Sequence, residues 1–188
     1  MKRKTMLRFY CCLVFISFFS ASTQAQPFFD AYKNQEGVQY LSINPMMFRL
    51  LGQMNLQTDD PESAAYLSMI QSIRSFKVLV TTKTMITNSL EEVIAKWVHQ
   101  ESLQLLLQLE EKEQLLRFFA ETGEAEQKVK RLLMFSKGKQ LEEAISIEGK
   151  KLQSVVLLLE GDIDLEVVGK LTDTMDIPGG EQLKKIKK

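Results

Sequence analysis

The chain has 188 residues, of which 24 are basic, 24 are acidic and one is histidine, so its formal net charge is zero. The first 25 residues contain four of the basic residues and none of the acidic ones, which leaves a net charge of −4 on the remaining 163 residues. A mildly acidic domain lacks the basic surface that general nucleic-acid binding requires, so we expect no nucleic-acid partner. The length suits one domain with a substantial core.

The first 25 residues have the pattern of a secretory signal peptide. A basic segment precedes an apolar run from Phe9 to Phe19, and Thr23 and Ala25 are small residues at the positions that a cleavage site requires. The run is shorter than the ~20 residues that cross a bilayer as a helix. We therefore expect cleavage after Ala25 and export of the mature chain to the periplasm or the cell exterior.

Both cysteines, Cys11 and Cys12, lie in this apolar run and are lost with it. The mature chain then forms no disulfide and is stabilised by its core alone. A lipid anchor on Cys12 is the alternative. The bulky residues Phe9 and Tyr10 precede it where a lipobox requires small ones, so the pattern favours a plain signal peptide.

The first part of the mature chain predicts two strands and two helices. Residues 38–43 alternate between apolar and polar, which predicts a strand. Asn44 as N-cap and Pro45 in the first turn predict a short helix that ends near Gly52. The loop 55–62 leads into a second helix. Residues 73–82 alternate again, as expected of a strand with one face more buried than the other.

The next helix is the clearest in the sequence. Asn88 with Glu91, and Ser89 with Glu92, both have capping-box spacing, which predicts a helix that begins there. Its apolar residues fall on one face: Leu90, Val93, Ile94, Trp97 and Val98. We expect Trp97, the single tryptophan, to pack against the sheet as a core anchor.

Propensity and spacing disagree between Ser102 and Ala120. The many leucines mixed with Gln, Glu and Lys favour a helix. Leu105, Leu107 and Leu109 alternate, however, and the charged segment 110–113 suits a hairpin tip. We predict two strands here, with a helix as the alternative.

Three turns centred on glycines separate the later strands. The turns lie at Gly123, Gly138 and Gly149, and the strands are predicted over residues 130–135, 143–147 and 153–159, joined as a meander. Gly161-Asp162 is expected to close the last strand, and Asp164 to cap a helix that contains Leu165, Val168, Leu171 and Met175 and stops at Pro178-Gly179-Gly180.

Strands in series, with helices early and at the end, predict an α+β fold. We expect a two-layer arrangement, a mainly antiparallel sheet with helices packed on one face. The predicted organisation is a signal peptide over 1–25, a single α+β domain over 26–180 and a basic tail over 181–188.

Three segments carry a family resemblance. Phe28-Phe29 and Tyr32 ahead of Gly37-Val38, the junction 42–47 and the junction 159–165 together resemble a family of small exported proteins. This family is common in Bacteroidetes-type Gram-negative bacteria and is classed as a domain of unknown function. The resemblance covers most of the mature chain. It implies an exported α+β domain and supplies no catalytic residue.

Few residues of the mature chain suit catalysis. It has one histidine, His99, and no cysteine, which excludes His-based zinc sites and cysteine nucleophiles within one chain. Glu101 and Ser102 are neighbours of His99 in sequence, but such spacing does not place side chains face to face on a helix. We therefore assign no catalytic, cofactor-binding or metal-binding residue and expect no cofactor.

Paired carboxylates are the remaining enzymatic feature, because two of them can hydrolyse a glycoside. The candidate pairs are Asp59 with Asp60, Glu91 with Glu92, and Asp162 with Asp164. Each pair has a structural interpretation as a helix cap or a turn. The segment 162–164 also resembles the start of a calcium loop, but the residues that follow lack the further oxygen ligands and the glycine of such a loop.

The leading functional hypothesis is therefore an exported, non-catalytic domain that binds an unidentified protein of the cell envelope, as a regulatory or sensing component. One alternative is a hydrolase that uses acidic residues. Another is a membrane-surface protein held by the basic tail 181–188, the only part expected to contact a membrane. Free edges of an antiparallel sheet also leave a homodimer by strand pairing open.

Overall fold

The computed structural model describes residues 28–53, 60–111, 113–123, 128–138, 141, 146–147 and 149–168. The helices are α2 (Phe29–Tyr32), α3 (Pro45–Gln53), α4 (Pro61–Ser72) and α5 (Thr84–Gln100). The strands are β1 (Val38–Ile43), β2 (Ser75–Thr81), β3 (Gln104–Glu111), β4 (Gln114–Thr122), β5 (Lys128–Gly138), β6 (Ser146–Ile147), β7 (Lys150–Lys151) and β8 (Ser154–Asp164). The expected signal peptide and basic tail lie outside the described residues.

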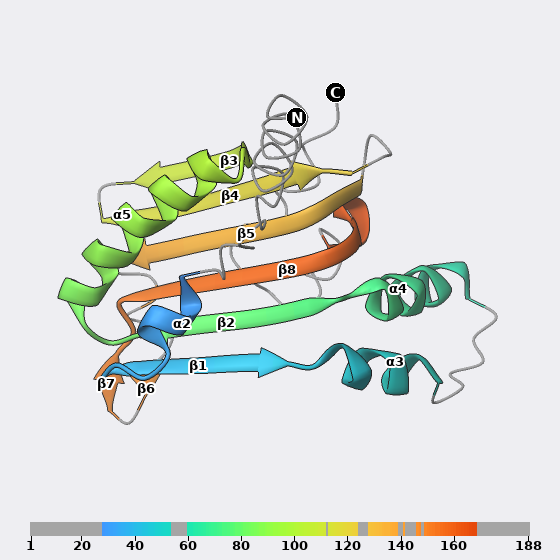
Figure 1. Ribbon diagram of the computed structural model, residues 1–188, viewed down its shortest axis with the longest axis horizontal. Coiled ribbons are helices and arrows are strands. Elements are labelled where there is room, and N and C mark those ends of the chain that lie inside the picture. The colour runs from blue at the N-terminus through green and yellow to red at the C-terminus, as the bar shows by residue number, and fades with distance from the viewer. Residues whose placement is uncertain are drawn as a thin grey trace, which may run out of the picture.

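Six strands form the main sheet in the order β1-β2-β8-β5-β4-β3, and every neighbouring pair is antiparallel (Figure 1). The expected α+β fold with an antiparallel sheet is confirmed. The β3–β4 hairpin also confirms two strands between Ser102 and Ala120, with the turn at the charged segment. The strands predicted at 38–43 and within 73–82 are β1 and β2.

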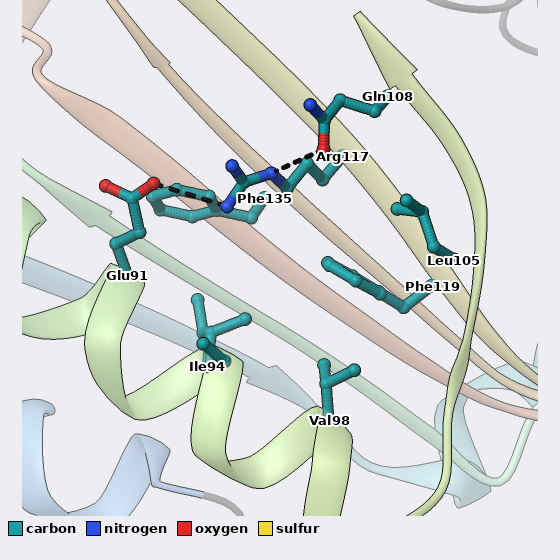
Figure 2. Close-up of a pocket in the computed structure, with 9 residues that line it drawn as sticks. Glu91, Ile94, Val98, Leu105, Gln108, Arg117, Phe119 and Phe135 are labelled. Atoms are coloured by element: carbon teal, nitrogen blue, oxygen red, sulfur yellow. Dashed lines mark hydrogen bonds and ion pairs between the residues drawn. The ribbon is translucent and has the colours of Figure 1, made fainter.

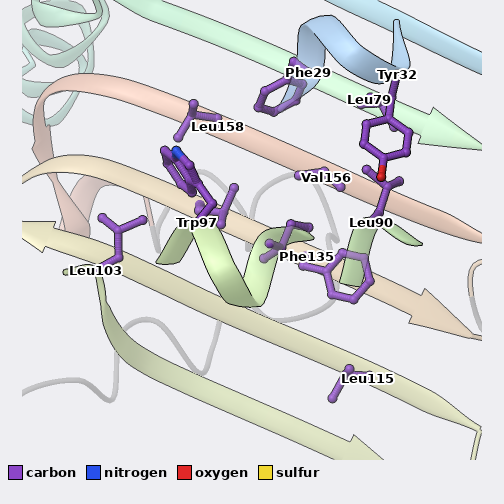
Figure 3. Packing of buried hydrophobic residues seen from close by; sticks show 12 residues of the cluster. Phe29, Tyr32, Leu79, Leu90, Trp97, Leu103, Leu115, Phe135, Val156 and Leu158 are labelled. Carbon is purple, nitrogen blue, oxygen red and sulfur yellow. The ribbon is translucent and has the colours of Figure 1, made fainter. Parts of the chain in front are cut away.

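One face of the sheet is covered by α5 and by the short helix α2. Alternation along the central strands directs Leu133 and Phe135 of β5, and Val156 and Leu158 of β8, toward this face, where all four are buried. Trp97 is 5% exposed among them, so its prediction as a core anchor is confirmed (Figure 3). The buried members of this α5-side cluster are Phe29, Tyr32, Leu79, Leu90, Ile94, Trp97, Leu103, Leu115, Leu133, Phe135, Val156 and Leu158.

The opposite face carries a second apolar cluster. The strand residues that alternate with those of the α5-side cluster point toward this opposite face. Helix α3, which follows β1, and helix α4, which precedes β2, lie beside each other at one end of these strands and contribute to the second cluster (Figure 1). The rings of Phe48 in α3 and Phe76 in β2 lie edge to face at 6.3 Å. The buried members are Phe48, Ile73, Leu116, Phe118, Ala120, Val129, Leu132, Leu159 and Ile163. The central strands are therefore apolar on both faces.

The predicted start of the long helix is wrong. Helix α5 begins at Thr84, four residues before Asn88, and the side chain of its N-cap, Lys83, makes no capping bond. The first turn is held instead by Thr87, whose hydroxyl lies 3.3 Å from the Lys83 carbonyl and 2.9 Å from the buried hydroxyl of Ser154. The capping-box pattern thus falls inside the helix, where Glu91 has a different role.

The predicted meander is also wrong. β5 pairs directly with β8, and among the described residues β6 pairs with β7 in a separate two-stranded sheet. A central strand requires apolar residues on both faces over its length. The eleven-residue strand β8 supplies them over most of its length. Of the predicted strand 143–147, residues 146–147 form β6, and residues 143–145 lie outside the described part.

Gly161 and Asp162 do not close the last strand, contrary to the prediction. β8 continues to Asp164, and its register with β5 shifts between Val129 and Arg131, which makes the Gly161–Asp162 pair a β-bulge. A Cβ at Gly161 would lie 2.5 Å from the carbonyl oxygen of Ser72, so the bulge lets the end of α4 approach the strand.

The predicted helix caps at Asn44, Asp60 and Asp164 are present. Asn44 accepts the amide of Met46 at 2.8 Å, Asp60 that of Ser63 at 2.9 Å, and Asp164 that of Glu166 at 2.9 Å. The last helix is described only to residue 168, so Leu171, Met175 and the Pro178-Gly179-Gly180 stop lie outside the described residues.

Candidate functional site

A groove lies between α5 and the β3–β4 hairpin, on the α5-covered face of the sheet (Figure 2). Its volume is about 260 Å³ and it is open to solvent on one side. The lining residues are Glu91, Ile94, Ala95, Val98, Leu105, Gln108, Arg117, Phe119 and Phe135. We call this feature the α5–β3 groove.

The groove forms because α5 leaves part of the sheet uncovered. Glu91, Ile94, Ala95 and Val98 follow helical spacing and form one wall. Alternate residues of the strands form the floor and the opposite wall, and they include the half-buried ring of Phe119 and the fully buried ring of Phe135 (Figure 2). The interior is therefore apolar, with polar groups at one end only.

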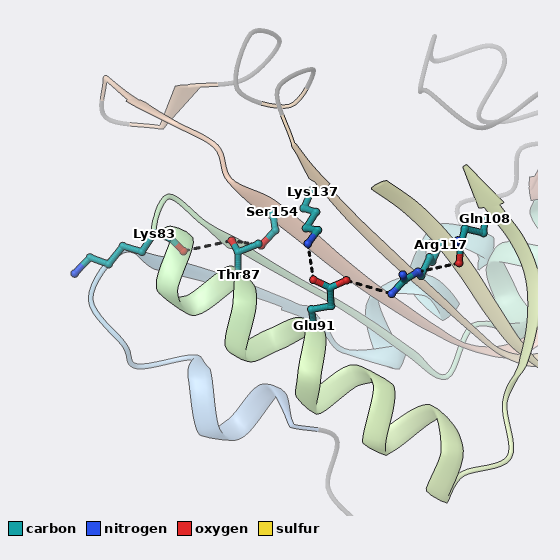
Figure 4. Close-up of polar contacts among 7 residues, drawn as sticks. All are labelled: Lys83, Thr87, Glu91, Gln108, Arg117, Lys137 and Ser154. Carbon is teal, nitrogen blue, oxygen red and sulfur yellow. Dashed lines mark hydrogen bonds and ion pairs between the residues drawn. The ribbon is translucent and has the colours of Figure 1, made fainter. Parts of the chain in front are cut away.

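The polar end is a chain of charged and amide side chains centred on Glu91 (Figure 4). One carboxylate oxygen of Glu91 accepts Arg117 Nη1 at 3.3 Å and the other accepts Lys137 Nζ at 2.5 Å. Arg117 Nε also donates to Gln108 Oε1 at 3.1 Å, and Gln108 Nε2 donates to Glu110 at 3.0 Å. The network connects α5 with three strands of the sheet.

A second ionic contact fixes the other end of α5. Arg131 of β5 donates to Glu121 at 2.5 Å and to Glu101, the C-cap of α5, at 2.7 Å, and its guanidinium lies 5.6 Å from the centre of the Trp97 ring. Burial lowers the pKa of Arg131, but the hydrogen bonds to Glu101 and Glu121 outweigh it and raise that pKa overall. Glu91 of α5 and Glu101 at its C-cap thus bind basic residues of the sheet on both sides of the apolar contact.

Residues 32–171 match the family described as Domain of unknown function (DUF4252). The chain belongs to this family. The match covers every residue of the α5–β3 groove. It confirms the resemblance to a family classed as a domain of unknown function, while the bacterial group and export stay predictions. No curated protein and no solved structure matches the chain.

In this DUF4252 domain His99 is exposed on α5. Glu101 binds Arg131 across the sheet, and the amide of Ser102 donates to the His99 carbonyl at 3.3 Å as part of the helix end. The structure therefore does not bring these three side chains together as a catalytic group. Within the described ranges, no cluster of three or more His, Cys, Asp or Glu residues is arranged to hold a metal ion.

The paired carboxylates have separate partners. Asp60 caps α4, and Asp59 lies outside the described residues. Glu91 belongs to the groove, whereas Glu92 is exposed. Asp162 accepts Lys128 at 2.6 Å, and Asp164 caps the helix that follows. No helix in the described part of the chain is both long enough and apolar enough to span a bilayer.

The residues that line the groove were not identified from the sequence as a site. The available signal was Arg117, a charged residue in the middle of an otherwise apolar strand. A charge at such a position requires a partner, because burying it alone is costly. The strand pattern by itself therefore indicates that Arg117 has an acidic partner, but it does not identify that partner.

Proposed function

We propose that this DUF4252 protein is an exported, non-catalytic binding domain of the cell envelope, and that the α5–β3 groove receives an apolar side chain of a partner protein. The observation that carries the proposal is the groove itself, an open apolar cavity beside the edge strand β3. Export is proposed from the N-terminal segment, with cleavage after Ala25.

The size of the groove favours a protein partner over a free cofactor. Pockets that enclose small molecules usually measure ~300–1,000 Å³ and cover most of the ligand, whereas this groove holds about 260 Å³ and is open. Such a space suits one aromatic or branched aliphatic side chain, the kind of residue that anchors protein interfaces.

The chemistry of the walls supports the same occupant. Phe119 offers a half-buried ring surface, and Leu105 on the rim is 51% exposed although it is a large apolar residue. The charged groups at the polar end already bind one another, so a partner can insert an apolar side chain without supplying a counter-charge. Docking beside β3 also places the partner within reach of the outer edge of this terminal strand, which pairs only with β4 among the described residues.

A groove-filling substitution tests the proposal. Ala95 lines the groove and is exposed, so Ala95→Phe is expected to fill the cavity while leaving the core intact. Met85, on the same helix, is 85% exposed and is not part of the groove, which makes Met85→Phe the matched control. The mature chain, residues 26–188, would carry a photo-cross-linking residue at Leu105 and would be incubated with envelope extract.

We expect one envelope protein to be cross-linked to the wild-type chain and to the Met85→Phe variant, and to be lost from the Ala95→Phe variant. Mass spectrometry would identify it and the peptide attached at position 105. The proposal is wrong if no protein is cross-linked there, or if Ala95→Phe captures the same protein equally well.

A further inference from the structure

The sheet face opposite α5, which we call the second face, is buried well beyond the place where α3 and α4 cover it. Both helices lie at one end of β1 and β2 (Figure 1). On the second face, Leu116, Phe118 and Ala120 of β4 are only 0–5% exposed. β4 is three strand spacings from β2, or ~14 Å, whereas packed helices lie within ~10 Å of their neighbours. Another part of the chain therefore covers β4.

The chain reaches the second face directly after β8. Asp164, the last residue of β8, pairs with Lys128 at the start of β5, and β5 is the neighbour of β4. A helical turn follows at residues 165–168, with Asp164 as its cap. Leu165 and Val168 of this turn pack against the second cluster. The described chain thus ends on the second face, close to the strand that is covered.

Residues 165–177 have the pattern of one amphipathic helix. Lys170 and Asp173 fall on one side of it, together with Glu166, which is exposed. The opposite side carries apolar residues at helical spacing: Leu165, Val168, Leu171 and Met175. Because the first two of these already pack on the second face, a continued helix directs the other two toward the same face.

The length of this segment matches the surface that needs a cover. Thirteen residues, 165–177, form a helix about 20 Å long, and Pro178 follows them. The buried row from Ala120 to Leu116 covers four residues of a strand, or about 13 Å. The segment is therefore long enough to lie along the whole row.

The N-terminal end of the chain is a poorer candidate for this cover. Phe28 packs against the α5-side cluster, and its ring lies 5.9 Å from that of Trp97. After the proposed cleavage at Ala25, only two residues precede Phe28. Two residues span about 7 Å at most, which is too short to pass around the sheet to its second face.

We propose that residues 165–177 form a helix that packs along β4 and β5 on the second face, with Leu171 and Met175 directed toward Leu116 and Phe118. Gly169 lowers the intrinsic stability of such a helix by about 1 kcal/mol, so packing on the sheet holds it in place. The domain then has a helical layer on each face of the sheet. Its second apolar face is covered by its own chain, which leaves the α5 side for a partner.

Single cysteines test which side of the segment is buried. Both cysteines of the sequence lie before residue 26, so each variant of the chain 26–188 has one thiol. A maleimide reagent would be added to folded Leu171→Cys and Met175→Cys, with Lys170→Cys and Asp173→Cys as controls. We expect about tenfold slower labelling at positions 171 and 175, because a thiol under the helix reacts only after local opening. Equal rates at all four positions would overturn the inference.

A second labelling experiment tests which face the helix covers. Leu107 is half-buried on the second face, whereas Leu105 lies on the α5 side. Met175→Glu should raise the labelling rate of Leu107→Cys severalfold and leave that of Leu105→Cys unchanged.

Lys170→Glu is the matched control, because it adds the same side chain on the outer side of the helix. It should change neither rate, and Trp97 fluorescence would verify that each variant is folded. Cover by another segment, such as residues 139–145, predicts no effect of Met175→Glu on Leu107→Cys, and that result would also overturn the inference. The groove test concerns capture of a partner on the α5 side, so either proposal can fail alone.

Discussion

Replacing Glu91 by Gln isolates the contribution of one charge to the contact between α5 and the sheet. The substitution keeps the side-chain size but removes the negative charge between Arg117 and Lys137, which lie 3.3 and 2.5 Å from its two oxygens. These three side chains are 27–31% exposed. The stability lost on removing one partner should therefore lie between that for exposed ion pairs, about 0–1 kcal/mol, and that for fully buried pairs, about 3–5 kcal/mol. We expect the free energy of unfolding to fall by about 1–2 kcal/mol.

Glu92→Gln is the control, since it makes the same chemical change at the next position of the same helix. Glu92 is exposed and forms no ion pair with any described residue, so its replacement should change the free energy of unfolding by less than about 0.5 kcal/mol. Urea unfolding can be followed by the fluorescence of Trp97, the single tryptophan, which is 5% exposed in the folded chain.

Equal effects of the two substitutions would refute the reasoning, because they would show that the charge of Glu91 has no specific partner. Salt provides a second check. In about 1 M NaCl the screening length falls to ~3 Å, so the difference between the variants should shrink yet persist, since the ion pairs are partly shielded from solvent.

Three further substitutions test packing and hydrogen bonding in the core. Gly161→Ala should lower the free energy of unfolding by about 1–3 kcal/mol, because the new Cβ would lie 2.5 Å from the Ser72 carbonyl oxygen; an unchanged urea midpoint would contradict the close approach. Ser154→Ala and Thr87→Val should each cost about 1–2 kcal/mol through loss of their buried 2.9 Å hydrogen bond, and the double variant should cost less than the two single losses added together. Strict additivity, measured by the same unfolding assay, would show that the two hydroxyls do not interact.

Sequence reasoning placed β5 and β8 from their apolar runs between turns, and it placed the other strands of the main sheet from alternation, which reflects burial that differs between faces. In β2 and in the β3–β4 hairpin, alternation is visible because one row of side chains packs more deeply than the other. In β3 this holds for Leu107 and Leu109, which pack against the cluster on the face opposite α5, whereas the register shift between Leu105 and Leu107 places the exposed Leu105 on the α5 side. Caps were also predictable, since Asn44 and Asp60 act on amides two or three residues away.

The errors arose where the outcome depends on distant residues. β8 could be joined to its neighbours as a meander or inserted between β2 and β5, and local turn signals at Gly138 and Gly149 are the same in both arrangements. The start of α5 is set by Thr87, which bonds to Ser154, 67 residues later in the chain. The capping-box spacing at Asn88 and Ser89 is a competing local signal for the helix start, but the contact between Thr87 and Ser154 accompanies a start at Thr84 instead.

The polar end of the groove also depends on residues that are distant in sequence. Glu91 bonds to Arg117, 26 positions later, and to Lys137, 46 positions later. Once Leu115 is known to face the core, alternation requires Arg117 to face it too, so an acidic partner on the covering helix can be inferred. The sequence offers Glu91 and Glu92, and only one of two adjacent helical residues can point toward the sheet. The choice follows from the residues that share the buried face, since Leu90, Ile94 and Trp97 orient α5 so that Glu91 lies at the border of the apolar contact. The apolar stripe of α5 thus determines which carboxylate faces the sheet, and Arg117 on the strand determines where that carboxylate binds.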